Sequence, residues 1–278
     1  MSSSGTYTLG VDRRSGLLLS VGVVAAAATV GVVLLGPPAG ARGGRGGASP
    51  APSPLASYPP LMAVEDLYTA FAEGGSATSA GEATVLSAIP VGDIVLPTGR
   101  VVGADVFFFN TEPFTRSLPA GRHPVLLLSS ARGPDLPADL AGDVAAAMIR
   151  AAPGDPVSWE LALLAGQDPA ILKPGEFFGY GVDSGTGCFA SPEAVAVLMA
   201  GDFDAYSDRI MHGMFPSNDV KDWKSWVEVT VDPASGANII GFSSGFGDGA
   251  YPSWFGLDAD GEPLVLVTDF GIVEAPVS

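Results

Sequence analysis

The sequence has few of the residues on which catalytic and metal sites commonly depend. Its 278 residues include a single cysteine, Cys188, and two histidines, His123 and His212. One cysteine excludes a disulfide within the chain, and neither paired cysteines nor an HExxH motif, the common zinc-binding patterns, occur. The GxxxxGK phosphate loop of nucleotide hydrolases is also missing. We therefore expect no metal and no cofactor.

Basic side chains are scarce as well. The chain has 13 Lys and Arg against 30 Asp and Glu, for a net charge of −17. Residues 1–60 hold four of the basic side chains and one of the acidic ones, so the rest of the chain carries nine against 29, or −20. A surface this acidic repels nucleic-acid backbones and anionic lipid headgroups, which argues against both as ligands. It can serve solubility alone, or it can attract a basic protein partner.

The N-terminal residues contain one long apolar run. From residue 17 to residue 36 the chain reads LLLSVGVVAAAATVGVVLLG, twenty residues without a charge, and a helix of this length crosses about 30 Å of hydrocarbon. We predict an N-terminal tail at 1–16, a transmembrane helix or uncleaved signal anchor at 17–36, and a Gly/Pro/Ser/Ala-rich linker at 37–60; a cleaved signal peptide is the alternative.

The same segments predict a location. Arginines flank the apolar run on both sides, so the orientation rests on the short N-terminal tail, which usually stays inside. We expect a single-pass protein of the cell membrane whose globular domain, residues 61–278, lies outside the cytoplasm.

Residues 61–278 show the pattern of many short strands. The chain has 37 glycines and 24 prolines, which mark frequent turns. Apolar spacing predicts a helix at 63–73, and Ser191 followed by Pro192 and Glu193 is a typical helix start. The C-terminal part alternates strands with turns and predicts a four-stranded antiparallel meander. We predict an α+β domain dominated by antiparallel sheet, sandwich-like or partly closed, with a few short helices.

Two long motifs carry a resemblance to a known family. They are GQDPAILKPGEFFGYGVDSGTGCF and FSSGFGDGAYPSWFGLDADGEPLVLVTDF, with shorter matches at LPTGRVV, PFTR, PAGRHPV and WELAL. Together they resemble the bacterial family catalogued as domain of unknown function 4241, over residues 86–272. The resemblance implies a domain extent and no activity. The apolar run and the linker lie outside it.

Cys188 is the first candidate site residue. Glycines precede it, and such a turn can expose the thiol and offer backbone N–H groups to an oxyanion. A nucleophilic thiol needs a base, however, and neither His123 nor His212 has a local partner that would orient it. A lone small thiol is more often buried and inert. Cys188 is kept as a candidate binding residue.

Asp183 and Asp248 are the second candidates. Each lies among glycines, in GVDSGTG and GFGDGAYP, which lets a ligand approach the backbone but is also what a tight turn requires. If both turns lie at the same end of the sheet, they form a polar and aromatic cleft with Tyr180, Tyr251 and Trp254. We predict this cleft as the binding surface and assign no catalytic residue and no metal ligand.

Three functions fit these observations. The first is a non-catalytic binding or interaction module on a membrane anchor, which uses the glycine-rich turns around Asp183 and Asp248. The second is a hydrolase-like enzyme that uses Cys188 or the pair of aspartates. The third is an accessory protein whose acidic surface recognises a basic partner. We favour the first, and its ligand or partner is not predicted.

Overall fold

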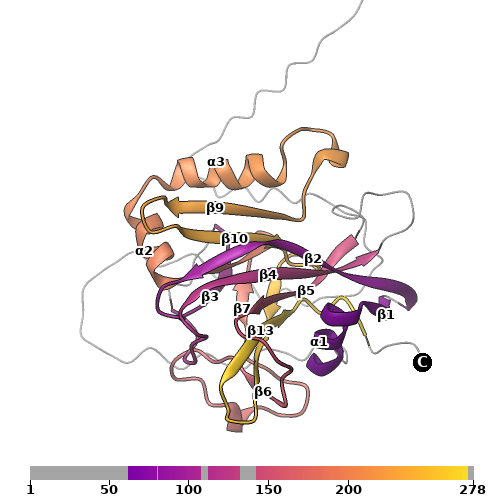
Figure 1. Cartoon of the computed structure of the whole chain (residues 1–278). Helices are drawn as coiled ribbons and strands as arrows, with labels where there is room; N and C mark the ends of the chain where they lie inside the picture. Colours follow the sequence, from indigo (N-terminus) through magenta and orange to yellow (C-terminus); the bar gives the residue numbers. More distant parts are fainter. Residues whose placement is uncertain (1–61, 80, 108–111, 132–141, 275–278) are drawn as a thin grey trace, which may run out of the picture. The chain divides into compact units, whose positions relative to one another are not determined.

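The computed structural model describes residues 62–79, 81–107, 112–131 and 142–274, all within the second of the two units into which the chain divides. These residues form three short α-helices and thirteen strands (Figure 1). The tail, the apolar run and the linker predicted for residues 1–60 lie outside the described residues. Among the helices that are described, none combines the length and the apolar character needed to span a bilayer.

The largest sheet has seven antiparallel strands and is curled. In spatial order the strands are β1 (Gly75–Ser79), β2 (Glu82–Leu96), β4 (Gly121–Ala131), β5 (Gly142–Arg150), β13 (Pro263–Asp269), β12 (Ser253–Leu257) and β6 (Ser158–Leu161). The long strand β2 bends at a bulge between Pro90 and Gly92. Beyond the bulge, Asp93 O accepts a hydrogen bond of 2.7 Å from Nδ2 of Asn238, a residue of the four-stranded sheet described below.

Two smaller sheets complete the strand pairing. The four-stranded sheet has the order β3 (Val102–Asp105), β8 (Thr186–Ala190), β10 (Ala237–Ser243) and β9 (Trp226–Asp232). The two-stranded sheet pairs β11 (Gly249–Tyr251) with β7 (Tyr180–Val182). All of these pairs are antiparallel.

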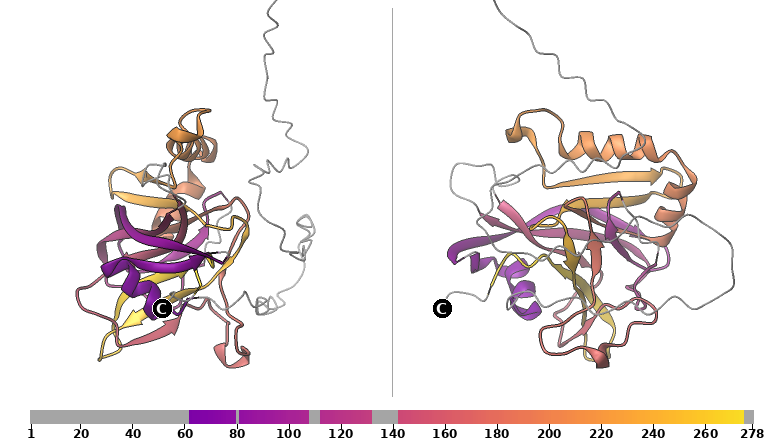
Figure 2. Two further views of the ribbon diagram at one scale, coloured as in Figure 1. Left: turned by 90° about the vertical axis from the view of Figure 1, so that its right-hand side faces the viewer. Right: turned by 180° about the vertical axis from the view of Figure 1, so that it is seen from behind.

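The helices cover the outer faces of the two larger sheets (Figures 1 and 2). They are α1 (Val64–Glu73), α2 (Pro192–Ala200) and α3 (Phe203–Met214), with short 3₁₀ turns at Pro169–Ile171 and Val220–Asp222. One apolar cluster packs α1 on the seven-stranded sheet, and another packs α2 and α3 on the four-stranded sheet. A third cluster fills the space between the sheets, where Phe189 and Phe242 pack edge to face with ring centroids 4.9 Å apart. The core therefore has three apolar layers between four layers of secondary structure.

The predicted α+β class, with mostly antiparallel strands and a few short helices, is confirmed. The predicted helix start is also confirmed, because Ser191 Oγ accepts a hydrogen bond from Ala194 N–H at 3.0 Å. The predicted C-terminal meander is wrong. Strands β9 and β10 form a hairpin in the four-stranded sheet, whereas β12 and β13 form one in the seven-stranded sheet. Both β10 and β13 are buried on both faces, and each is an inner strand of its own sheet.

Candidate binding surface

Strands β7 and β11 bring the two glycine-rich turns together. In their antiparallel ladder Val182 lies opposite Gly249. The next residues along, Asp183 and Asp248, therefore lie at the same end of this ladder. Both side chains are exposed.

A buried carboxylate holds the Asp183 turn in place. Asp105 ends β3 and is only 1% exposed. Its Oδ2 accepts hydrogen bonds from the backbone N–H groups of Asp183 (2.8 Å) and Ser184 (2.6 Å), and its Oδ1 accepts one from Phe107 N–H at 2.7 Å. A charged acceptor with several N–H donors is well stabilised inside a protein. Asp105 is therefore a structural anchor for the turn, which the sequence analysis did not identify.

The Asp248 turn is held by its own hydrogen bonds and by the first turn. Ser244 Oγ and Tyr251 Oη both donate to Gly247 O, at 2.7 and 2.8 Å. Ser244 N–H donates to Gly185 O at 3.1 Å. A Cβ atom added to Gly185 would lie 3.4 Å from the Cα of Gly247, so the two turns touch directly. Small residues permit this contact.

The tip of the second turn carries an exposed aromatic side chain. Phe246 is 65% exposed, although most large apolar side chains of the domain are buried. It lies two residues before Asp248, between two glycines whose positive φ angles (66° at Gly245 and 96° at Gly247) shape the turn. Glycines on both sides were the available sequence signal for such a tip. We call the following residues the twin-turn surface: Asp183, Ser184, Gly185, Phe246, Gly247 and Asp248.

The charge of Asp183 acts on the exposed carboxyl group of Asp248. Partial burial raises the pKa of Asp248, and the negative charges of Asp183 and Asp105 raise it further, while the N–H of Gly185 opposes the shift. A positive charge brought to this surface would therefore relieve an existing repulsion.

Three aromatic residues predicted for this surface do not line a cleft there. Tyr180 and Tyr251 are 2% and 1% exposed and face the core between the sheets. Tyr251 supports the Asp248 turn from the core side, because its hydroxyl donates a hydrogen bond to the Gly247 carbonyl. Trp254 lies in β12 and packs against the apolar cluster beneath α1. The expected polar and aromatic cleft is absent from the described residues, because the period of two along β7 and β11 turns both tyrosines inward.

Cys188 also lies away from the surface. It is fully buried in β8, where it faces the cluster under α2 and α3. Burial, followed by the nearby charge of Asp105, raises the pKa of the thiol well above its usual value. The sulfur therefore stays protonated and out of reach of a substrate.

A GxSxG pattern, typical of serine nucleophiles, runs from Gly241 to Gly245. Ser243, its central serine, ends β10 and pairs with Thr186 in the antiparallel sheet. A turn and a short strand follow it, whereas a nucleophile elbow leads from a strand into a helix. The pattern is therefore part of the sheet and of the Asp248 turn.

Comparisons with known proteins support the assignment that the motifs suggested. The profile of the family described as protein of unknown function (DUF4241) matches residues 94–268, which is more than half of the chain. The chain belongs to this family. The DUF4241 match runs from within β2 to within β13, so it contains both turns of the twin-turn surface and leaves α1 outside. No curated protein and no solved structure matches the chain. In the described part of the chain, no three His, Cys, Asp or Glu side chains are grouped so that they could hold a metal ion.

Proposed function

We propose that this DUF4241 protein is a non-catalytic binding module whose twin-turn surface engages a basic segment of a partner protein. The observation that carries the proposal is the exposed side chain of Phe246, on a hydrogen-bonded turn that also presents Asp248 and touches the turn of Asp183. An exposed aromatic side chain on a rigid loop can bind a partner with little loss of conformational entropy.

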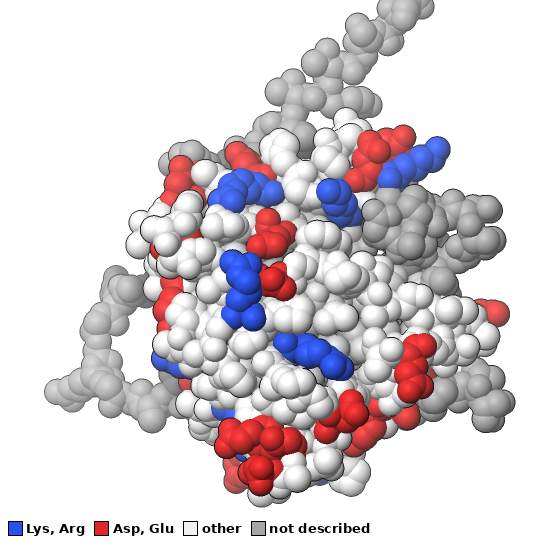
Figure 3. All heavy atoms as spheres, in the orientation of Figure 1, with Lys and Arg blue, Asp and Glu red and all other residues white. Residues whose placement is uncertain are grey.

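The charge of the surface favours a basic partner. Asp183 and Asp248 repel each other, and the chain outside residues 1–60 has a net charge of −20. Figure 3 shows one face of the molecule, where acidic side chains gather in the lower part and Lys and Arg side chains lie across the middle and the upper part. A lysine or arginine placed between the two carboxylates would lower the pKa of Asp248. Binding should then strengthen as the pH rises through the titration of Asp248 and level off above it.

The location is part of the same proposal. Residues 17–36 are an uncharged apolar run, and residues 37–60 are rich in glycine and proline, a composition typical of tethers that hold a domain away from a bilayer. We infer a single-pass cell-membrane protein with its domain outside the cytoplasm. The test uses Ser53→Cys in the tether, since Cys188 is buried and should stay silent. A membrane-impermeant maleimide should label this variant in intact cells, and labelling only after lysis would contradict the orientation.

The binding proposal is tested with the full chain in nanodiscs of neutral lipid and a fluorescent Lys/Leu peptide, by anisotropy. Phe246→Ser should weaken binding about tenfold, as expected for loss of an aromatic anchor. Asp248→Asn should weaken it about threefold, and the effect should shrink at high salt. The matched control is Asp260→Asn, which removes one charge from the exposed β12–β13 turn. If it weakens binding as much as Asp248→Asn does, the peptide senses only net charge and the twin-turn surface is not the site.

One observation favours a hydrolase-like alternative. The raised pKa of Asp248 beside Asp183 resembles the separation of roles in a carboxylate acid and base pair. Such an enzyme would hydrolyse p-nitrophenyl esters or glycosides with a bell-shaped pH profile, and both Asp183→Asn and Asp248→Asn would abolish the activity. Peptide binding without turnover would leave the binding module as the function.

A further inference from the structure

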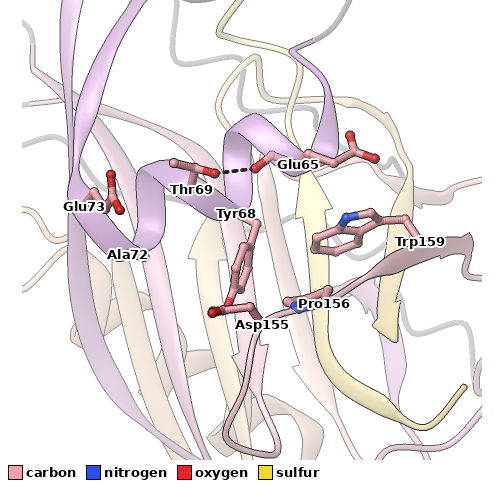
Figure 4. A pocket seen from close by; sticks show the side chains of 8 residues that line it. All are labelled: Glu65, Tyr68, Thr69, Ala72, Glu73, Asp155, Pro156 and Trp159. Atoms are coloured by element: carbon pink, nitrogen blue, oxygen red, sulfur yellow. Dashed lines mark hydrogen bonds between the residues drawn. The ribbon is translucent and has the colours of Figure 1, made fainter. Parts of the chain in front are cut away.

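A hollow distinct from the twin-turn surface lies between α1 and the turn that precedes β6 (Figure 4). Its volume is about 310 Å³, at the lower end of the range for small-molecule sites. Helix α1 contributes Tyr68, Glu65 and Glu73, the segment that leads into β6 contributes Asp155 and Pro156, and β6 itself contributes Trp159. The α1 residues precede the family match, so this feature combines the family domain with an element outside it.

Two aromatic rings form one wall of the hollow. The ring centroids of Tyr68 and Trp159 are 5.8 Å apart, with an interplanar angle of 61°. Trp159 is partly exposed and packs closely over Gly256, where an added Cβ would lie 2.9 Å from the indole Cζ3. The indole is therefore held in place by its neighbours while part of it faces the hollow (Figure 4). A fixed, partly exposed indole is the best aromatic partner for a cation.

The second ring is fixed by polar contacts. Tyr68 Oη donates to Asp155 Oδ1 at 2.8 Å and accepts from Arg150 Nη2 at 2.9 Å. The guanidinium carbon of Arg150 lies 5.6 Å from the centroid of the Tyr68 ring. Burial and the hydrogen bond to Asp155 raise the pKa of Tyr68, so the phenol stays neutral. The tyrosine already has a cation beside it, which leaves Trp159 as the ring available to a ligand.

The charged side chains that line the hollow are all acidic. They are Glu65, Glu73 and Asp155, and neither lysine nor arginine belongs to the described lining. Figure 4 shows Glu65 beside Trp159 and Glu73 toward the other end of α1. Arg150 and Asp155 both form a hydrogen bond with the Tyr68 hydroxyl, so their opposite charges lie close together and offset each other. The charges of Glu65 and Glu73 therefore make the electrostatic potential in the hollow negative. This lining repels anions, and an apolar neutral ligand would gain nothing from the carboxylates.

We propose that the hollow binds a small organic cation, an ammonium ion with short alkyl groups. The cationic head would contact the indole face of Trp159 and the carboxylate of Glu65, and the alkyl groups would cover Pro156 and Tyr68. The aromatic wall separates this ligand from an inorganic cation, which would need several oxygen ligands in place of a ring. The proposal is independent of the twin-turn surface and does not require the protein to bind a partner there.

The experiment uses ¹⁹F NMR of the full chain in neutral detergent, labelled with 5-fluorotryptophan. The chain has four tryptophans, and the Trp159 resonance is assigned by Trp159→Phe. Tetramethylammonium chloride is titrated against sodium chloride at equal ionic strength. We expect the Trp159 resonance to shift and saturate with a Kd on the order of 1 mM, while the other three resonances stay unchanged.

A matched pair of variants tests the role of Glu65. Glu65→Gln should weaken binding about threefold. Asp66→Asn removes a charge from the same exposed turn of α1 without lining the hollow, and it should leave the Kd within about a factor of 1.5. Both side chains are exposed, so neither change threatens the fold. Equal responses of Trp159 to sodium and tetramethylammonium, or equal losses in the two variants, would overturn the proposal.

Discussion

The side chain of Asp269, at the end of β13, is fully buried. Its Oδ1 accepts a hydrogen bond from Gly271 N–H at 2.7 Å, and its Oδ2 has no hydrogen-bond partner among the described residues. Burial penalises the charged form and raises the pKa of this carboxyl to about 7, against the opposing effect of the Gly271 N–H. We predict that Asp269→Asn stabilises the protein at neutral pH and does not stabilise it in acid.

The magnitude follows from the shift. In the unfolded chain the pKa of an aspartate is about 3.9, and in the folded chain that of Asp269 is about 7. Because the folded state binds this proton more tightly, the contribution of Asp269 to stability is full below about pH 4 and falls as the pH rises to about 7. The loss amounts to about 4 kcal/mol at most. Near pH 4 the protonated acid leaves one O–H donor unpartnered, whereas the amide leaves two N–H donors, so there we expect the variant to be less stable by about 1 kcal/mol.

The assay is urea unfolding of the wild type and Asp269→Asn at several pH values, followed by tryptophan fluorescence. The difference in unfolding free energy should grow from about pH 4 to about pH 7 and then stay level. Asp260→Asn, at an exposed turn, is the control and should show no such growth. A difference that does not depend on pH would refute the reasoning, as would a variant that is less stable than the wild type at about pH 8.

Three further predictions concern the residues around the turns. Gly245→Ala should cost about 2–4 kcal/mol in urea unfolding, because φ is 66° and the new Cβ would lie 2.8 Å from Val144 O; a near-neutral change would contradict this geometry. Cys188 should react with Ellman's reagent only as fast as the protein unfolds, and rapid reaction of the folded protein would show that the thiol is accessible. Asp105→Asn should cost about 2–3 kcal/mol, since the amide turns one acceptor into a donor; it should also speed hydrogen exchange at the Asp183 amide, and unchanged exchange would argue against the anchor.

The candidate site illustrates how far residue patterns reach. Glycines around Asp183 and Asp248 marked two turns, because positive φ angles and close contacts are local demands. The pattern did not show that Asp105, far away in the chain, holds the first turn through three backbone N–H groups. It also placed Tyr180 at the surface, since an aromatic beside a glycine turn can point either way until its strand is paired.

The sequence by itself determined the local elements of this protein. The Ser191 cap starts α2, turns such as the one at Asp260 close hairpins, and the abundance of such turns sets the antiparallel class, because each depends on residues only a few positions apart. Only the tertiary structure decided which sheet receives each hairpin, that Cys188 faces the helices, and that Trp159 packs against Tyr68 in the wall of a hollow. These contacts join residues separated by tens of positions, and their free energy comes from apolar surfaces that fit only once the layers have packed.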